Sequence, residues 1–273
     1  MDYKVPALSM VFMAIAALAV VAIPTVLLLY FRKKRHADVL PFWIGCAVFV
    51  VFALILESLA KLLVMQLGAW QSILNNTWLF GIIGGLFAGV FEETGRFVAF
   101  KTVLKNKRSK NVNALMYGAG HGGFEAFYLV FISMVTNLVF ASIINSGNTA
   151  MLTSGITDSS ALQAMNATFS ALSTTAPGIY LVSVAERISA IALHISLSVL
   201  VWFAAKHSRQ FWLFPLAVLL HAFVDSVAGI MAGYTSNLWL IEGAVYLLSA
   251  CCVVLTVVVW KKSTRKELDT AQA

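Results

Sequence analysis

The sequence predicts an all-α fold: a polytopic integral membrane bundle of about seven transmembrane helices, in one transmembrane domain over residues 1–273. Of these residues, 60% are hydrophobic and only 11% are charged, whereas soluble domains carry about 25% charged residues. The apolar residues form runs long enough to cross a bilayer, which needs about 20 residues. In this setting the net charge of +7 indicates cytoplasmic loops beside membrane lipid and no nucleic-acid partner.

Seven apolar runs, each bounded by charges or turn residues, are the expected helices. Pro24 predicts a kink in the first run, which we expect to remain as a spanning helix. The three cysteines lie in apolar runs and indicate packing residues, not disulfides. The expected helices are Val5–Phe31, Val39–Leu67, Leu79–Leu104, Val112–Ile144, Ala176–Ala205, Phe211–Ala232 and Leu238–Trp260.

Basic residues predict the orientation of this seven-helix path. The first, third, fifth and seventh runs are followed by 15 of the 19 lysines and arginines, and the alternate loops carry none. Because an excess of Lys and Arg marks cytoplasmic loops, the N-terminus is expected outside and the C-terminus in the cytoplasm. The expected location is a bacterial cytoplasmic membrane.

The longest loop, about residues 145–175, is expected on the external side. Within it Leu162, Met165, Phe169 and Leu172 recur at the spacing of one helical face. The pattern predicts a short helix on the outer surface, which acts either as a lid or as a packed connecting segment.

Ionisable residues inside the apolar runs are the main functional signal, since each costs about 2.5–3.5 kcal/mol at the bilayer centre on insertion scales. Glu57 and Lys61 are four residues apart and predict a structural ion pair. Glu242, at the start of the seventh run, is expected to be solvated near the outer interface. The remaining ionisable residues occur in four core helices, about 79–104, 112–144, 176–205 and 211–232. They are Glu92, Glu93 and Arg96; His121 and Glu125; Glu186, Arg187 and His194; and His221 and Asp225.

These polar groups share one depth. Glu93, His121, His194 and His221 each lie 11 or 12 residues from the nearest basic residue on the cytoplasmic side. At 1.5 Å per residue, each lies about 16–18 Å along the helix axis from that basic residue. This is near the middle of a hydrocarbon core of about 30 Å. Glycines at 118, 120, 122 and 123 allow close helix approach. We therefore expect one mid-membrane site.

Hydrolysis within a membrane suits such a set of residues. A glutamate can activate water, and an arginine three or four residues further on can hold a neighbouring glutamate ionised. Histidines can stabilise the oxyanion, orient the water or bind a metal. A mid-membrane cluster of acids and histidines also fits a proton-coupled transporter, which is one alternative.

The motifs resemble those of a known superfamily. They are Glu-Glu-x-x-Arg at 92–96, an aromatic residue four before a histidine at 117–121, and His-x-x-x-Asp at 221–225. They resemble the CAAX prenyl protease and bacteriocin-processing membrane proteases. Gly-His-Gly-Gly-x-Glu at 120–125 is most similar to the YhfC branch, with the PrsW proteases as distant relatives. The resemblance covers about residues 79–232.

By this resemblance the chain is an intramembrane endopeptidase acting on a peptide or protein substrate in or near the membrane. Glu92 is implied as the water-activating base, with Glu93 and Arg96 as its partner and positioner. His121 and His221 are implied to bind the oxyanion or the water. The remaining residues implied at the site are Asp225, where relatives often have Asn, and Tyr117, Glu125, Glu186, Arg187 and His194.

Two features depart from the CAAX protease pattern. Glutamate and arginine are separated by two residues instead of three, which leaves open whether Glu92 or Glu93 faces the pocket, and Tyr117 replaces the usual Phe. His121, His194 and His221 are candidate zinc ligands, but no His-Glu-x-x-His motif is present. We favour a metal-free site from the sequence, with zinc as the alternative. A non-catalytic scaffold of the same fold is the other function left open.

Overall fold

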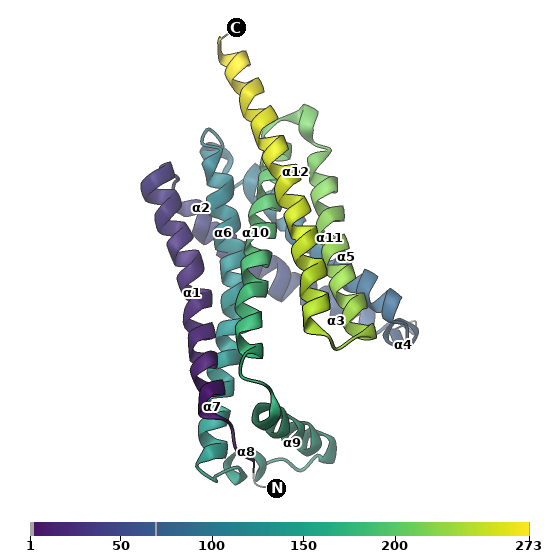
Figure 1. Ribbon diagram of the computed structural model, residues 1–273. Coiled ribbons are helices and arrows are strands. Elements are labelled where there is room, and N and C mark those ends of the chain that lie inside the picture. The colour runs from purple at the N-terminus through teal and green to yellow at the C-terminus, as the bar shows by residue number, and fades with distance from the viewer. Residues whose placement is uncertain (1–2, 69, 273) are drawn as a thin grey trace. The chain divides into compact units, whose positions relative to one another are not determined.

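The computed structural model describes residues 3–68 and 70–272, and every regular element in those residues is a helix (Figure 1). This confirms the all-α fold. Short 3₁₀ turns (η2, η4) and π-helical stretches (η1, η3) interrupt or join the α-helices. The elements are α1 (Ala7–Arg35), α2 (Leu40–Val48), η1 (Phe49–Glu57), α3 (Ser58–Met65), α4 (Trp70–Leu74), α5 (Thr77–Lys101), η2 (Lys105–Lys107), α6 (Val112–Ala126), η3 (Phe127–Phe131), α7 (Ile132–Asn145), α8 (Ala150–Thr153), α9 (Ser159–Thr174), α10 (Ile179–Lys206), η4 (Ser208–Gln210), α11 (Leu213–Tyr234) and α12 (Leu238–Gln272).

Within the described residues, six helical stretches are long and apolar enough to cross a membrane, which makes the chain an integral membrane protein. The helix α5 has 25 residues but carries four charged side chains. The seventh crossing and the orientation therefore stay predictions. The six stretches are Ala7–Arg35, Leu40–Met65, Val112–Asn145, Ile179–Lys206, Ser208–Tyr234 and Leu238–Asp269.

The chain divides into two compact units, and the first comprises Met1–Ile23 and Ala126–Arg187. It contains α9, which confirms the short helix predicted between residues 145 and 175. One face of α9 is packed, since Phe169 and Leu172 are buried, and the ring of Tyr3 lies edge-on to Phe169 at 5.6 Å. A lid function for this helix stays a prediction.

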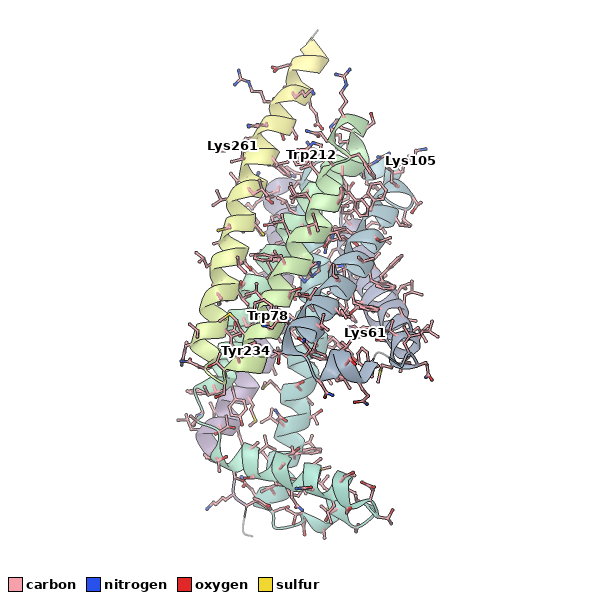
Figure 2. All side chains as sticks on the ribbon, turned by 90° about the vertical axis from the view of Figure 1, so that its right-hand side faces the viewer. Lys61, Trp78, Lys105, Trp212, Tyr234 and Lys261 are labelled. Atoms are coloured by element: carbon pink, nitrogen blue, oxygen red, sulfur yellow. The ribbon has the colours of Figure 1, made fainter. Side chains whose placement is uncertain are left out.

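The second unit comprises Pro24–Glu125 and Ile188–Ala273. Lys105, Trp212 and Lys261 lie at one end of it, and Trp78 and Tyr234 lie toward the other (Figure 2). Aromatic side chains at both ends of membrane helices are typical of residues at the two lipid–water interfaces. The middle of this unit is therefore the part expected in hydrocarbon.

Three glycines at four-residue spacing let α5 and α11 pack backbone to backbone. A Cβ atom at Gly85 would lie 2.3 Å from the Ala222 carbonyl oxygen, and one at Gly89 would lie 2.6 Å from the Val218 oxygen. Gly81 is the third member of this row and meets α11 in the same way. Small residues on one helical face permit such an approach in membranes.

The glycines of α6 confirm the predicted close approach to its neighbours. A Cβ atom at Gly120 would lie 2.0 Å from the Phe42 carbonyl oxygen of α2. A Cβ atom at Gly118 would lie 2.5 Å from the Cα atom of Ile195 on α10. The α6 backbone is thus held between α2 and α10, which fixes the position of His121.

The last helix is longer than predicted. The sequence predicted a helix that ends at Trp260, but α12 continues to Gln272. The Glu267 carboxylate explains the difference, because its Oε1 atom lies 2.8 Å from Lys206 Nζ and 2.6 Å from His207 Nε2. These contacts attach the polar end of α12 to the end of α10.

Candidate functional site

The helix α5 brings three charged side chains into the interior of the second unit. Glu93 and Arg96 are fully buried and Glu92 is 6% exposed. Arg96 and Glu93 are three residues apart on one face and form an ion pair through Nη1 and Oε1. This confirms the predicted pairing of the arginine with one glutamate and leaves Glu92 for other partners.

His194 on α10 lies between Arg96 and Glu125. Its Nδ1 atom is 3.2 Å from Arg96 Nη2. Because a guanidinium only donates hydrogen bonds, Nδ1 accepts and the ring proton is placed on Nε2. That nitrogen forms an ion-pair contact with the Glu125 carboxylate on α6, so both ring nitrogens have partners.

His121 on α6 lies against Glu92, with 2.8 Å between its Nε2 atom and Glu92 Oε2. The His121 ring is fully buried. It lies edge-on to Phe49 at 5.4 Å and stacks at 6.0 Å on Tyr117, one helical turn earlier. These aromatic contacts fix the ring plane, so the imidazole is held toward the carboxylate.

His221 on α11 has a carboxylate near each ring nitrogen. Its Nδ1 atom lies 2.8 Å from Glu93 Oε1, and its Nε2 atom lies 3.5 Å from Asp225 Oδ2. Arg96 forms an ion pair with Glu93, which is therefore ionised. The Glu93 carboxylate accepts the hydrogen bond and His221 Nδ1–H donates it. A carboxylate at the far nitrogen is the usual way in which a metal-ligating histidine is oriented.

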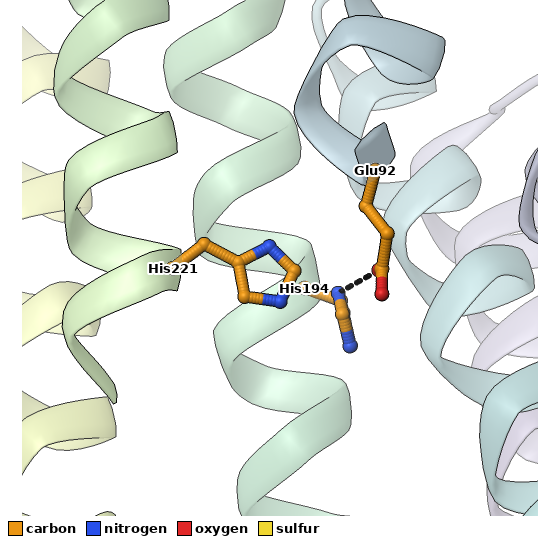
Figure 3. Close-up of side chains that lie close together, drawn as sticks. All are labelled: Glu92, His194 and His221. Atoms are coloured by element: carbon orange, nitrogen blue, oxygen red, sulfur yellow. Dashed lines mark ion pairs between the residues drawn. The ribbon is translucent and has the colours of Figure 1, made fainter. Parts of the chain in front are cut away.

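Glu92, His194 and His221 converge to form one group of possible metal donors (Figure 3). One donor atom from each lies within 4.8 Å of the others, and all three residues are buried. The Glu92 Oε2 and His194 Nδ1 atoms are 3.9 Å apart. Two imidazoles and one carboxylate make up a common protein ligand set for catalytic zinc.

The cluster is also rich in carboxylates, which are ligands that a cation can bind. Glu92, Glu93, Glu125 and Asp225 each contribute one, and Arg96 forms an ion pair with Glu93. Because a buried carboxylate favours a nearby positive charge, the donor set fits a metal ion.

The structure places nine of the eleven residues singled out from the sequence around this centre. Glu186 and Arg187 belong to the first unit, where they form an ion pair with each other, and their role at the site stays a prediction. The predicted Glu57–Lys61 pair is also present, at 2.5 Å.

Sequence reasoning missed two supporting features of this site. Phe49 from the second apolar run lies against His121, and nothing in its local sequence distinguishes it from the other apolar residues. The α5 glycine row brings Glu93 beside His221, and its four-residue spacing was a signal available from the sequence.

Comparisons with known proteins agree on one family. A family model described as YhfC intramembrane metalloprotease matches residues 19–245. The uncharacterized membrane protein YhfC of Bacillus subtilis (strain 168) is 34% identical over 216 residues, which cover 78% of this chain and 81% of the relative. No solved structure matches.

Proposed function

Because the chain belongs to the YhfC intramembrane metalloprotease family, we propose that it hydrolyses a peptide bond in or near the membrane with the help of a bound zinc ion. The sequence alone favoured a metal-free glutamate site. Two observations now favour a metal: the family description and the buried Glu92, His194 and His221 group. The convergence of these three donors carries the proposal.

Glu92, His194 and His221 would hold the ion, and His194 would bind through Nδ1 in place of the hydrogen bond that this atom accepts from Arg96. When bound, zinc lowers the pKa of a coordinated water toward neutrality and polarises a substrate carbonyl. In this proposal Glu92 acts as a ligand, whereas the resemblance implied it as the base. The two roles are separable, since loss of a ligand removes the metal and loss of a base does not.

The neighbouring side chains orient these donors. His121, 2.8 Å from Glu92 Oε2, holds the carboxylate in place. Glu93 fixes the tautomer of His221 by accepting the hydrogen of Nδ1. Arg96 forms an ion pair with Glu93 and keeps it ionised.

Asp225 is the carboxylate that we place as proton acceptor. Its side chain is 41% exposed, against 8% for Glu92, so among these groups it is the more open to an entering water. It lies 3.5 Å from His221 Nε2 and one turn along α11. From there it can accept the proton of the attacking water and pass it to the leaving amine.

Mapping of new protein N-termini in membranes tests the peptidase directly. Cells expressing the wild type are expected to gain N-termini within or beside transmembrane segments, and cells expressing His221→Ala are not. His36→Ala is the matched control, because His36 is exposed and outside the cluster. An N-terminal profile that is the same for wild type and His221→Ala, at equal protein levels, would leave a scaffold or transporter as the better account.

A further inference from the structure

Small side chains form the contact of α12 with α10 inside the second unit. The two helices run in the same direction, because Lys206 at the end of α10 contacts Glu267 near the end of α12. Earlier on both helices, Thr256 Oγ1 donates a hydrogen bond to the Ser196 carbonyl oxygen at 3.2 Å. Among the described residues of α12 beyond Ile241, those that are buried are Ser249, Cys252, Thr256 and Ser263.

Ser189 on α10 and Ser249 on α12 lie at one level of this helix contact. Each comes seven residues before the contacting residue of its own helix, Ser196 or Thr256, and seven residues make about two turns and return to the same face. Both side chains are buried, with 4% and 3% of their surface exposed. The Oγ atom of neither has a hydrogen-bond partner among the described residues.

These two hydroxyl groups differ from the other buried serines of α10. Ser196 and Ser198 donate to the carbonyl oxygen four residues earlier, at 2.8 and 2.7 Å, which is the usual bond of a serine inside a helix. A buried hydroxyl group without a partner is costly, and a buried water satisfies such groups by bonding to two or more of them. We propose that Ser189 and Ser249 bind a water molecule between α10 and α12.

This water site is close in depth to Asp225. Ser189 is five residues before His194, about 7.5 Å along α10, and Asp225 is four residues after His221, about 6 Å along α11. The two helices run in opposite directions, because only the short turn η4 joins the end of α10 to the start of α11. Since His194 and His221 meet, Ser189 and Asp225 lie on the same side of the donor group.

The three helices also pack together near this level, where Leu193, Val224 and Cys252 belong to one buried core. Peptide hydrolysis consumes one water for each bond cleaved, and hydrocarbon supplies none. The water held by Ser189 and Ser249 is therefore the supply for Asp225, the proton acceptor. This supply role rests on the proposed peptidase function, whereas the water site itself does not.

Reversible unfolding of the full-length protein in mixed micelles tests the water site. Ser189→Ala and Ser249→Ala should each raise the unfolding equilibrium constant about five-fold relative to Ser196→Ala, because the remaining hydroxyl group and the water each lose a partner. Ser196→Ala is the matched control, since its hydroxyl group bonds within its own helix. The double variant should show less than the sum of the two effects, because both act on one water. Additive effects, or an unfolding constant at or below that of the control, would overturn the site.

Peptide cleavage by the same variants tests the supply role. Ser189→Ala and Ser249→Ala should lower kcat by a similar factor, because turnover follows the occupancy of the water site, and KM and zinc content should match those of Ser196→Ala. An unchanged kcat, or a lower kcat that follows loss of zinc, would overturn the supply role. A wild type without peptidase activity would overturn the proposed function, and the unfolding measurements would still decide the water site.

Discussion

The substitution Gly85→Ala tests how the α5–α11 contact supports the site. The added Cβ atom would lie 2.3 Å from the Ala222 carbonyl oxygen, which is 1.1 Å inside the 3.4 Å limit of ordinary contact. Two backbones must then separate by about 1 Å, and overpacking of this kind costs about 1–3 kcal/mol. The unfolding free energy should fall by that amount.

The same separation should reach the chemistry, because Glu93 lies eight residues along α5 and contacts His221 on α11 at 2.8 Å. An increase of about 1 Å in the distance between Glu93 and His221 breaks this hydrogen bond. A misplacement of that size can lower turnover about 100-fold. Gly85→Ala therefore changes no reacting group but should reduce peptidase activity.

Gly84→Ala is the matched control, because a Cβ atom at Gly84 has no neighbour within 4 Å. It should leave activity unchanged and stabilise α5 by up to about 1 kcal/mol, since Ala is the better helix former. Reversible unfolding by SDS in mixed micelles gives the stability of each variant, and peptide cleavage gives the activity. Equal stability of the two variants would refute the packing argument.

Three further predictions concern single carboxylates. Glu93→Gln should lower metal affinity about 10–100-fold by removing the acceptor that orients His221; a metal titration that matches the wild type would contradict this. Asp225→Asn should keep the metal but lower turnover at least about 100-fold, and loss of metal instead would make Asp225 a ligand. At the α1–α2 junction, a hydrogen bond from Lys110 at 2.9 Å lowers the pKa of Asp38. A lowered folded-state pKa adds stability above the unfolded value of about 3.9, and this stability is lost as the pH falls. Asp38→Asn should therefore cost about 0.5–1 kcal/mol at pH 7 and progressively less in thermal melts toward pH 3.

The helices were predictable because apolar runs bounded by charge have few alternatives in a membrane. The helix expected at Leu79–Leu104 is observed as α5, Thr77–Lys101. The helix expected at Leu238–Trp260 begins at the same residue as α12. The end of α12 was missed, because its polar last turns are held by contacts with α10 that no local pattern reveals.

The site was predictable as a set of residues but not as a set of contacts. Counting the depth of each residue from the nearest cytoplasmic basic residue placed Glu93, His121, His194 and His221 at one level, and these side chains lie in one cluster together with Glu92. Arg96 pairs with Glu93 within α5, as the spacing predicted. His121 with Glu92 and His221 with Glu93 are instead contacts between different helices. Helix rotation and register decide these pairs, and a single sequence does not specify them.

Elemental analysis of the purified protein tests the central claim most directly. We expect one zinc per chain in the wild type and in His36→Ala, and loss of zinc in Glu92→Gln and in His194→Ala/His221→Ala. Zinc retained in Glu92→Gln with turnover abolished would return Glu92 to the role of base. A wild-type protein that is active without any bound metal, after purification free of chelators, would contradict the metal-dependent account.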